Sequence, residues 1–225
     1  DYKANRELPD ANLEFQLASC QRITELLGIH SLSFQDYEAD DIIGTLQRQV
    51  AGDRPTIIVT RDKDLGQLLR ENDLMWDFAI DEYSGPTEIK AKFGVEPHQI
   101  PDYLALAGDS VDNIPGVRGV GAKTAAALLN YFSDIDFMYE RIDEIEDIGL
   151  RGAKKIKASL IEQELDVRRF QKITNIMCDI DLEVRLEDLR PGSVDSVMAL
   201  EFFQEMNFGN GLKKRVMNLT QDADA

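Results

Sequence analysis

Seven carboxylates in three short clusters constrain what this chain can fold into more than any other feature of its sequence. The first cluster, Tyr37-Glu38-Ala39-Asp40-Asp41, has three acids within four positions, and two acidic pairs follow downstream. The seven residues are Glu38, Asp40, Asp41, Asp62, Asp64, Asp109 and Asp112. Two carboxylates about 4 Å apart repel each other by roughly 4 kcal/mol at an effective dielectric near 20, so seven in one cleft require divalent cations or extensive protonation. Two or more Mg²⁺ or Mn²⁺ ions are expected there because hard cations prefer oxygen ligands.

The acidic clusters lie beside the predicted secondary structure of an α/β fold. Residues 55–60, Pro-Thr-Ile-Ile-Val-Thr, predict a strand buried on both faces of a parallel sheet, and one acidic pair follows directly. A helix is expected from Ala39, with two of the acids in its first turn. From Thr87 onward the pattern is helical. We therefore predict a mostly parallel central sheet flanked by helices in residues 1–96, and a helical region in residues 97–225 whose C-terminal part returns to the core.

The rest of the composition is that of a globular protein. A helix with one buried stripe is predicted over residues 10–28, because apolar residues recur there at three- and four-residue intervals: Leu13, Leu17, Cys20, Ile23 and Leu27. Cys20 and Cys178 are expected to be reduced, buried thiols. No apolar run approaches the ~18 residues of a membrane span, and the first residues lack a signal-peptide pattern. We expect a monomeric cytoplasmic protein with no membrane partner.

The net charge of −17 opposes nucleic acid binding, because polyanions normally bind basic surfaces. Two features weaken that objection. Bound metal ions would neutralise the seven acids, and basic residues cluster at 118–123, 151–157 and 213–215. The local field of such clusters can oppose the net charge.

A glycine-bearing turn over residues 114–124, Ile-Pro-Gly-Val-Arg-Gly-Val-Gly-Ala-Lys-Thr, leads directly into an alanine-rich helix, and residues 149–155 carry a fainter copy. Its glycines let the backbone approach a phosphate, and the free N–H groups at the helix start bind an anion without reading bases. The residues expected to contact DNA are Gly116, Gly119, Val120, Gly121, Ala122, Lys123 and Thr124. Combined with a two-metal site, which activates water and stabilises the leaving oxygen of a phosphodiester, the turn predicts a sequence-independent nuclease.

These motifs resemble those of the flap endonuclease family, specifically bacterial 5′-nucleases like the 5′→3′ exonuclease domain of DNA polymerase I and its stand-alone relatives. The resemblance is carried by the Tyr37 cluster, by Thr-Arg-Asp-Lys-Asp-Leu at 60–65, by Gly-Asp-Ser-Val-Asp-Asn-Ile-Pro-Gly at 108–116, and by Asp-Tyr-Lys-Ala-Asn-Arg at 1–6. It implies that residues 1–96 are the nuclease core. It also implies a DNA substrate with a 5′ end or 5′ flap, and a role in DNA repair and replication.

The resemblance also implies roles for single residues. Glu38, Asp40 and Asp41 would serve mainly the first metal, and the four later aspartates would complete that site and build the second. Lys3 would stabilise charge on the scissile phosphate, assisted by Arg6. The glycine turn resembles the family's helix-hairpin-helix element, which holds K⁺ through backbone carbonyls. Those carbonyls would belong to Leu106, Ala107, Pro115, Val117 and Val120.

Family members have a further strand, with a metal-binding Asp, upstream of the segment that resembles residues 1–6. The resemblance therefore implies that this chain is an N-terminally truncated fragment, of the stand-alone form, whose own activity would be weak or absent. Two other functions are compatible with the residues. One is a non-catalytic module that binds branched DNA. The other is a PIN-type ribonuclease, against which the helix-hairpin-helix segment argues.

Overall fold

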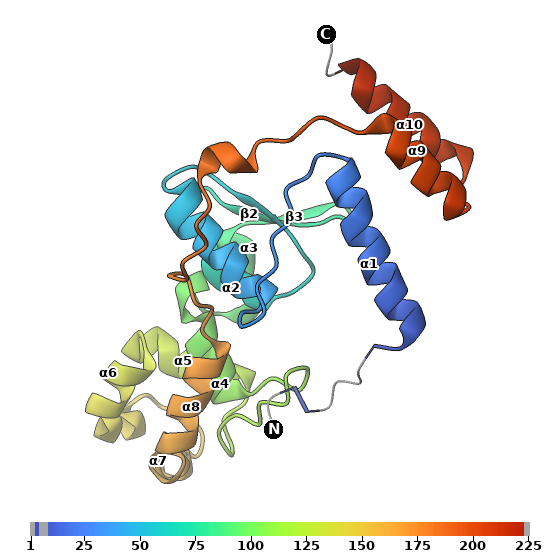
Figure 1. Ribbon diagram of the computed structural model, residues 1–225. Coiled ribbons are helices and arrows are strands. Elements are labelled where there is room, and N and C mark those ends of the chain that lie inside the picture. Colours follow the sequence, from blue (N-terminus) through green and yellow to red (C-terminus); the bar gives the residue numbers. More distant parts are fainter. Residues whose placement is uncertain (1–2, 5–8, 223–225) are drawn as a thin grey trace. The chain divides into compact units, whose positions relative to one another are not determined.

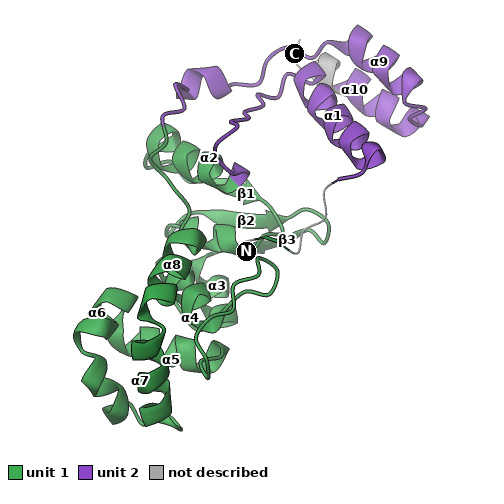
Figure 2. Cartoon of the chain, turned by 60° about the horizontal axis from the view of Figure 1, so that its bottom comes forward, with its two compact units in different colours: residues 1–6, 40–180 green, residues 7–39, 181–225 purple. Residues whose placement is uncertain are grey.

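The computed structural model describes residues 3–4 and 9–222, and the chain divides into two compact units. Unit 1 comprises residues 1–6 and 40–180, and unit 2 comprises residues 7–39 and 181–225 (Figure 2). Each unit has its own hydrophobic core. The units are not the sequence regions 1–96 and 97–225, whose boundary stays a prediction.

Unit 1 contains a small mixed sheet, in which the described strands have the order β1-β2-β3. β1 (Ile57–Val59) pairs in parallel with β2 (Leu74–Asp77), and β2 pairs antiparallel with β3 (Glu82–Ser84). The α/β class is confirmed, with an antiparallel strand added to the predicted parallel pair. The expected burial of β1 on both faces is wrong. Ile58 is buried, whereas Ile57 and Val59 are 57% and 59% exposed, because the core of unit 1 packs on only one face of this strand.

The helices of unit 1 surround that core. α2 (Ala39–Thr45) begins at the expected residue and continues into a π-helix (Leu46–Ala51). The later helices are α3 (Pro86–Phe93), α4 (Ile100–Ala107), α5 (Ala122–Phe132), α6 (Ile135–Glu140), α7 (Ala153–Glu162) and α8 (Glu164–Thr174), with 3₁₀ helices between α3 and α4 and between α6 and α7. Figures 1 and 2 both show α5, α6 and α7 at the end of unit 1 away from the strands. This agrees with the predicted helical subdomain.

α4 lies at the centre of unit 1. Every residue from Ile100 to Leu106 is buried, which is typical of a helix that is apolar on all sides. Its one buried acid, Asp102, accepts hydrogen bonds from the Ile135 N–H (2.9 Å) and from Gln171 Nε2 (2.8 Å). Burial raises the pKa of Asp102, and these two bonds offset part of that effect. α4 therefore provides a rigid support for the loop that follows it.

Unit 2 contains α1 (Ala11–Leu26), α9 (Ser196–Glu205) and α10 (Asn210–Asp222). The α1 helix has the expected start, because the Asp10 side chain accepts a hydrogen bond from the Leu13 N–H (2.8 Å). The predicted buried stripe is wrong from Leu13 to Cys20: Leu13 and Leu17 are 46% and 57% exposed, and Cys20 is exposed and is not the expected buried thiol. The core of unit 2 involves only the last turns of α1, around Leu26.

A buried carboxylate, Asp73, joins the segments before β1 and β2. Its oxygens accept hydrogen bonds from the Thr56 N–H (2.8 Å), from Gln47 Nε2 (3.0 Å) and from Arg70 Nε (2.7 Å). Burial alone would raise its pKa, but the bonds from Arg70 and Thr56 outweigh it and lower the pKa from 3.8 to about 2. Asp73 is 1% exposed, so solvent screens this network little.

Asp73→Asn is therefore expected to lower the free energy of unfolding by about 2 kcal/mol at neutral pH, since one pKa unit corresponds to ~1.4 kcal/mol. Because the folded pKa is depressed, this stabilisation is complete above the unfolded pKa and is lost as the pH falls toward the folded pKa. Urea unfolding should show that the gap between wild type and variant shrinks from about pH 5 toward about pH 2. The exposed Asp179→Asn control should show no gap. A difference in unfolding free energy that does not change with pH would contradict the proposed stabilising role of the Asp73 charge.

Candidate active site

Three of the seven predicted carboxylates converge. Asp64, Asp109 and Asp112 each offer an oxygen, and these oxygens lie within 4.8 Å of one another. In the described part of the chain they are the only group of three or more potential metal ligands. Asp64 is partly buried, and Asp109 and Asp112 are 6% and 9% exposed. Three acids so close and so shielded repel one another strongly unless cations neutralise them.

The electrostatics of Asp64 fit a metal ligand. Burial and the charges of Asp62 and Asp109 raise its pKa from 3.8 to about 6, against the opposing effect of Lys63. Its Oδ1 atom is buried and makes no hydrogen bond within the described structure. This buried carboxylate oxygen, which the Lys63 ammonium approaches at 3.3 Å, lies beside two further carboxylates, and such a donor set suits Mg²⁺ or Mn²⁺.

Lys63 forms ion pairs with two aspartates of this cluster. Its Nζ lies 2.5 Å from Asp109 Oδ2 and 3.3 Å from Asp64 Oδ1. Burial lowers its pKa, but the hydrogen bond to Asp109 and the charge of Asp64 outweigh burial, and the pKa is raised overall. Sequence reasoning does not single out this residue. Its position between two aspartates of the 60–65 motif is the signal that could have found it.

Two local structures bring the aspartates together. Asp64 begins a 3₁₀ helix (Asp64–Leu68) that follows β1, so the strand end directs it to the site. Asp109 and Asp112 lie in the loop after α4, where Asp109 and Ile114 exchange two backbone hydrogen bonds of 2.7 Å. The loop is tied back to α4, because the Val117 N–H donates to the Leu106 carbonyl (2.8 Å).

Close backbone contact between Gly108 and Gly116 closes this loop. Gly116 has φ +66°, and a Cβ added to it would lie 2.4 Å from the Gly108 nitrogen. Gly108 has φ +84°, and its added Cβ would lie 2.8 Å from the Ile114 carbonyl oxygen. Only glycine fits such a crossing at both positions. The crossing sets where Asp109 and Asp112 lie relative to the helix-hairpin-helix segment.

The other predicted acids lie outside this group of three. Asp62 is exposed, and its Oδ1 accepts a hydrogen bond from the Asp64 N–H (3.0 Å). Asp40 and Asp41 are in the first turn of α2, as expected, and Asp41 Oδ1 accepts a hydrogen bond from the Met177 N–H (2.9 Å). Glu38 belongs to unit 2.

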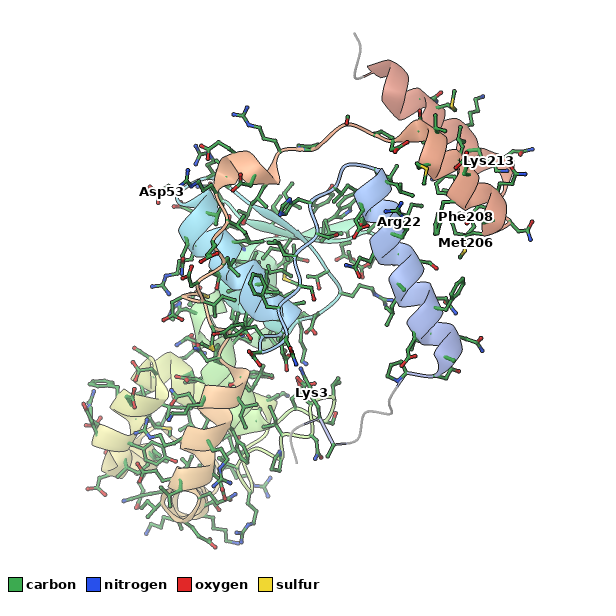
Figure 3. All side chains as sticks on the ribbon, in the orientation of Figure 1. Lys3, Arg22, Asp53, Met206, Phe208 and Lys213 are labelled. Carbon is green, nitrogen blue, oxygen red and sulfur yellow. The ribbon has the colours of Figure 1, made fainter. Side chains whose placement is uncertain are left out.

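Of the two predicted catalytic cations, the structure describes Lys3 and not Arg6, which lies outside the described residues. The Lys3 N–H donates to the Asp112 carbonyl (3.2 Å), and Lys3 has φ +55°. The segment that carries Lys3 is therefore joined to the aspartate loop, where Figure 3 labels it. This contact joins segments more than a hundred residues apart in sequence.

The glycine turn leads directly into α5, as the sequence predicts. Gly119 has φ +84°, and added Cβ atoms at Gly119 and Gly121 would meet nothing within 4 Å, so their backbone is open to a ligand. Gly121 caps α5, and its carbonyl accepts from the Thr124 and Ala125 N–H groups. The N–H groups of Ala122 and Lys123, which precede these two donors in the first turn, are left for an anion. Among the carbonyls expected to hold K⁺, that of Leu106 accepts from Val117 and that of Val117 accepts from Val120.

Comparison with known proteins identifies the family. The family model of the 5′-3′ exonuclease N-terminal resolvase-like domain matches residues 1–94, and that of the 5′-3′ exonuclease C-terminal SAM fold matches residues 95–197. The 5′-3′ exonuclease of Aquifex aeolicus is 34% identical over 215 residues, which are 95% of this chain and 71% of that protein. The chain belongs to the 5′-3′ exonuclease family. The resemblance inferred from the motifs is thus confirmed.

Longer relatives and solved structures complete the comparison. DNA polymerase I of Pseudomonas aeruginosa is 36% identical over 214 residues, so that 94% of this chain spans 23% of that protein. A complex of the bacteriophage T5 D15 flap endonuclease with DNA and metal ions has a TM-score of 0.59 at 17% identity, covering 98% of this chain and 77% of that one. The catalytic core of Rad2 in complex with DNA substrate has a TM-score of 0.60 at 13% identity, covering 93% and 70%. At these identities the solved structures show the fold alone.

Among the described residues, no helix combines the length and the apolar content that crossing a membrane requires.

Proposed function

We propose that the protein is a divalent-metal-dependent 5′-nuclease that hydrolyses DNA phosphodiester bonds at a 5′ end or 5′ flap. One observation carries the proposal: in a chain of the 5′-3′ exonuclease family, the carboxylates of Asp64, Asp109 and Asp112 lie within 4.8 Å of one another. Support comes from the T5 flap endonuclease complex, which has the same fold and contains DNA and metal ions.

Asp64, Asp109 and Asp112 are the proposed main ligands of Mg²⁺ or Mn²⁺, with Asp40, Asp41 and Asp62 of the same unit completing a site for two or more ions. Bound divalent ions would supply activated water and neutralise charge on the phosphodiester. Lys3 and Arg6 would hold the scissile phosphate, because their cationic side chains offset the charge that the aspartates place beside it. Burial of Asp109 and Asp112 keeps these carboxylates rigid and partly dry, which strengthens their electrostatic effect.

The helix-hairpin-helix segment would bind the DNA backbone. The open glycines Gly119 and Gly121 and the start of α5, with Lys123 and Thr124, suit a phosphate without base contacts. A K⁺ ion held by the carbonyls of Leu106, Ala107, Pro115, Val117 and Val120 would add positive charge that this acidic protein lacks. A cytoplasmic monomer, with a nuclease core in residues 1–96 and this DNA-binding region in residues 97–225, completes the proposal.

Removal of divalent metal is the direct test. EDTA should abolish cleavage of a labelled 5′-flap DNA by the intact protein, and excess Mg²⁺ or Mn²⁺ should restore it. The measurement is product formation on a denaturing gel, with matched DNA and RNA strands side by side. Flap binding without cleavage at any metal concentration would instead identify a non-catalytic branched-DNA binder. Preferential cleavage of the RNA strand would identify a PIN-type ribonuclease.

A further inference from the structure

The ammonium group of Lys63 lies where a divalent cation would compete with it. Nζ approaches Asp109 Oδ2 at 2.5 Å and Asp64 Oδ1 at 3.3 Å, and the three side chains are only 32%, 5% and 16% exposed, respectively. A pairing so shielded from water is screened little by salt. Lys63 thus neutralises part of the negative charge of a cluster that would otherwise be self-repelling.

The same two carboxylates are proposed metal ligands, so the inference rests on the proposed function. A divalent ion binds carboxylate oxygen more closely than an ammonium does, at about 2.0–2.1 Å for Mg²⁺. Metal and ammonium would repel each other and would share the same lone pairs. Occupation of Asp64 and Asp109 by metal therefore excludes the Lys63 contacts seen here.

The structure provides a place for the displaced side chain. A cavity of about 140 Å³ is lined by Lys63 itself, by the segment that follows β1, by β2 and β3, and by α3. Besides Lys63, three acids and two cations line it: Asp77, Glu82, Glu88, Arg61 and Lys92. Asp77 pairs with Arg61 (3.3 Å) and Glu88 accepts from the Gly85 N–H (2.8 Å), whereas the Glu82 side chain has no ion pair within the described structure. The Lys63 ammonium, once displaced from Asp109, would have space in this cavity and would lie near negatively charged side chains.

We propose that Lys63 is a tethered counter-cation that occupies the position between Asp64 and Asp109 until a divalent ion displaces it toward this cavity. Metal affinity is then lower than the carboxylates alone would give, because each binding event must break the Lys63 pairs. When no metal is bound, the positive charge of Lys63 offsets the repulsion among the carboxylates of the cluster. Lys63 is a positioning residue in this scheme, and its effect is exerted through the aspartates.

Calorimetric titration of the 225-residue chain with MnCl₂ tests the proposal. Lys63→Met keeps the aliphatic stem and removes the competing charge, so its Kd for Mn²⁺ should fall about 10-fold or more, within the usual range of coupling between sites. Lys63→Arg keeps the charge and should bind Mn²⁺ as wild type does. Lys172→Met removes an exposed positive charge of α8 that lines neither the cavity nor the aspartate cluster, and it too should bind as wild type does.

Thermal melting provides a second readout that does not depend on activity. In EDTA, Lys63→Met should melt below wild type because the aspartates lose their counter-ion, and saturating Mn²⁺ should close or reverse the gap. Mn²⁺ binding by wild type with equal or weaker binding by Lys63→Met would overturn this inference and leave the proposed function standing. Absence of Mn²⁺ binding in wild type and in every variant would overturn both.

Discussion

Asp64→Asn and Asp112→Asn should each reduce metal-dependent cleavage of a 5′-flap DNA by the intact protein by about 100-fold or more. Each substitution keeps the shape of the side chain and removes a negative oxygen from the group whose oxygens lie within 4.8 Å of one another. Loss of one preorganised charge-stabilising group at a reaction centre typically costs on the order of 10²–10³ in rate. Initial rates at saturating Mg²⁺ measure the effect, with circular dichroism to confirm that the variants fold.

Asp53→Asn is the matched control for these variants. Asp53 is an exposed acid of unit 1, and Figure 3 shows it far from Lys3, whose N–H donates to the Asp112 carbonyl. The same loss of charge at this exposed position, which belongs neither to the aspartate cluster nor to the loop after α4, should leave the cleavage rate unchanged, because charges at the protein surface are largely screened at ordinary ionic strength. If Asp64→Asn and Asp112→Asn both cleave at the wild-type rate, the proposed metal site is wrong.

Gly116→Ala should cost about 2–5 kcal/mol of the free energy of unfolding. The new Cβ would lie 2.4 Å from the Gly108 nitrogen and 2.6 Å from the Ala107 carbonyl carbon, and backbone atoms at such distances must move apart. The cost combines about 1–2 kcal/mol for a left-handed conformation at φ +66° with about 1–3 kcal/mol for overpacking. Urea unfolding monitored by circular dichroism measures the loss.

Gly119→Ala separates these two contributions. Gly119 has φ +84°, but its added Cβ would meet nothing within 4 Å, so only the conformational cost of about 1–2 kcal/mol applies. Gly116→Ala should also weaken Mn²⁺ binding, because the loop that it displaces carries Asp109 and Asp112. Equal stability losses in the two variants would show that the crossing of Gly108 and Gly116 does not hold this loop.

Local patterns in the sequence were sufficient for several features. The start of α2 at Ala39, the strand before Asp62 and Asp64, and the glycine turn into α5 each depend on residues adjacent in the chain. Backbone preferences, capping and hydrophobic periodicity act over a few residues, so short motifs predict them. The family motifs lie in the same segments, and comparison with the relatives confirmed the family.

Contacts between distant segments were decided by tertiary structure alone. The sequence named seven candidate acids, yet only packing of the α4 loop against the end of β1 determines that Asp64, Asp109 and Asp112 meet. Likewise, the exposed face of β1 and the pairing of Lys63 with Asp109 depend on what packs against them, not on their neighbours in the chain. The contacts and the burial of a carboxylate depend on residues that can lie tens of positions away in the sequence. A local sequence pattern does not contain that information.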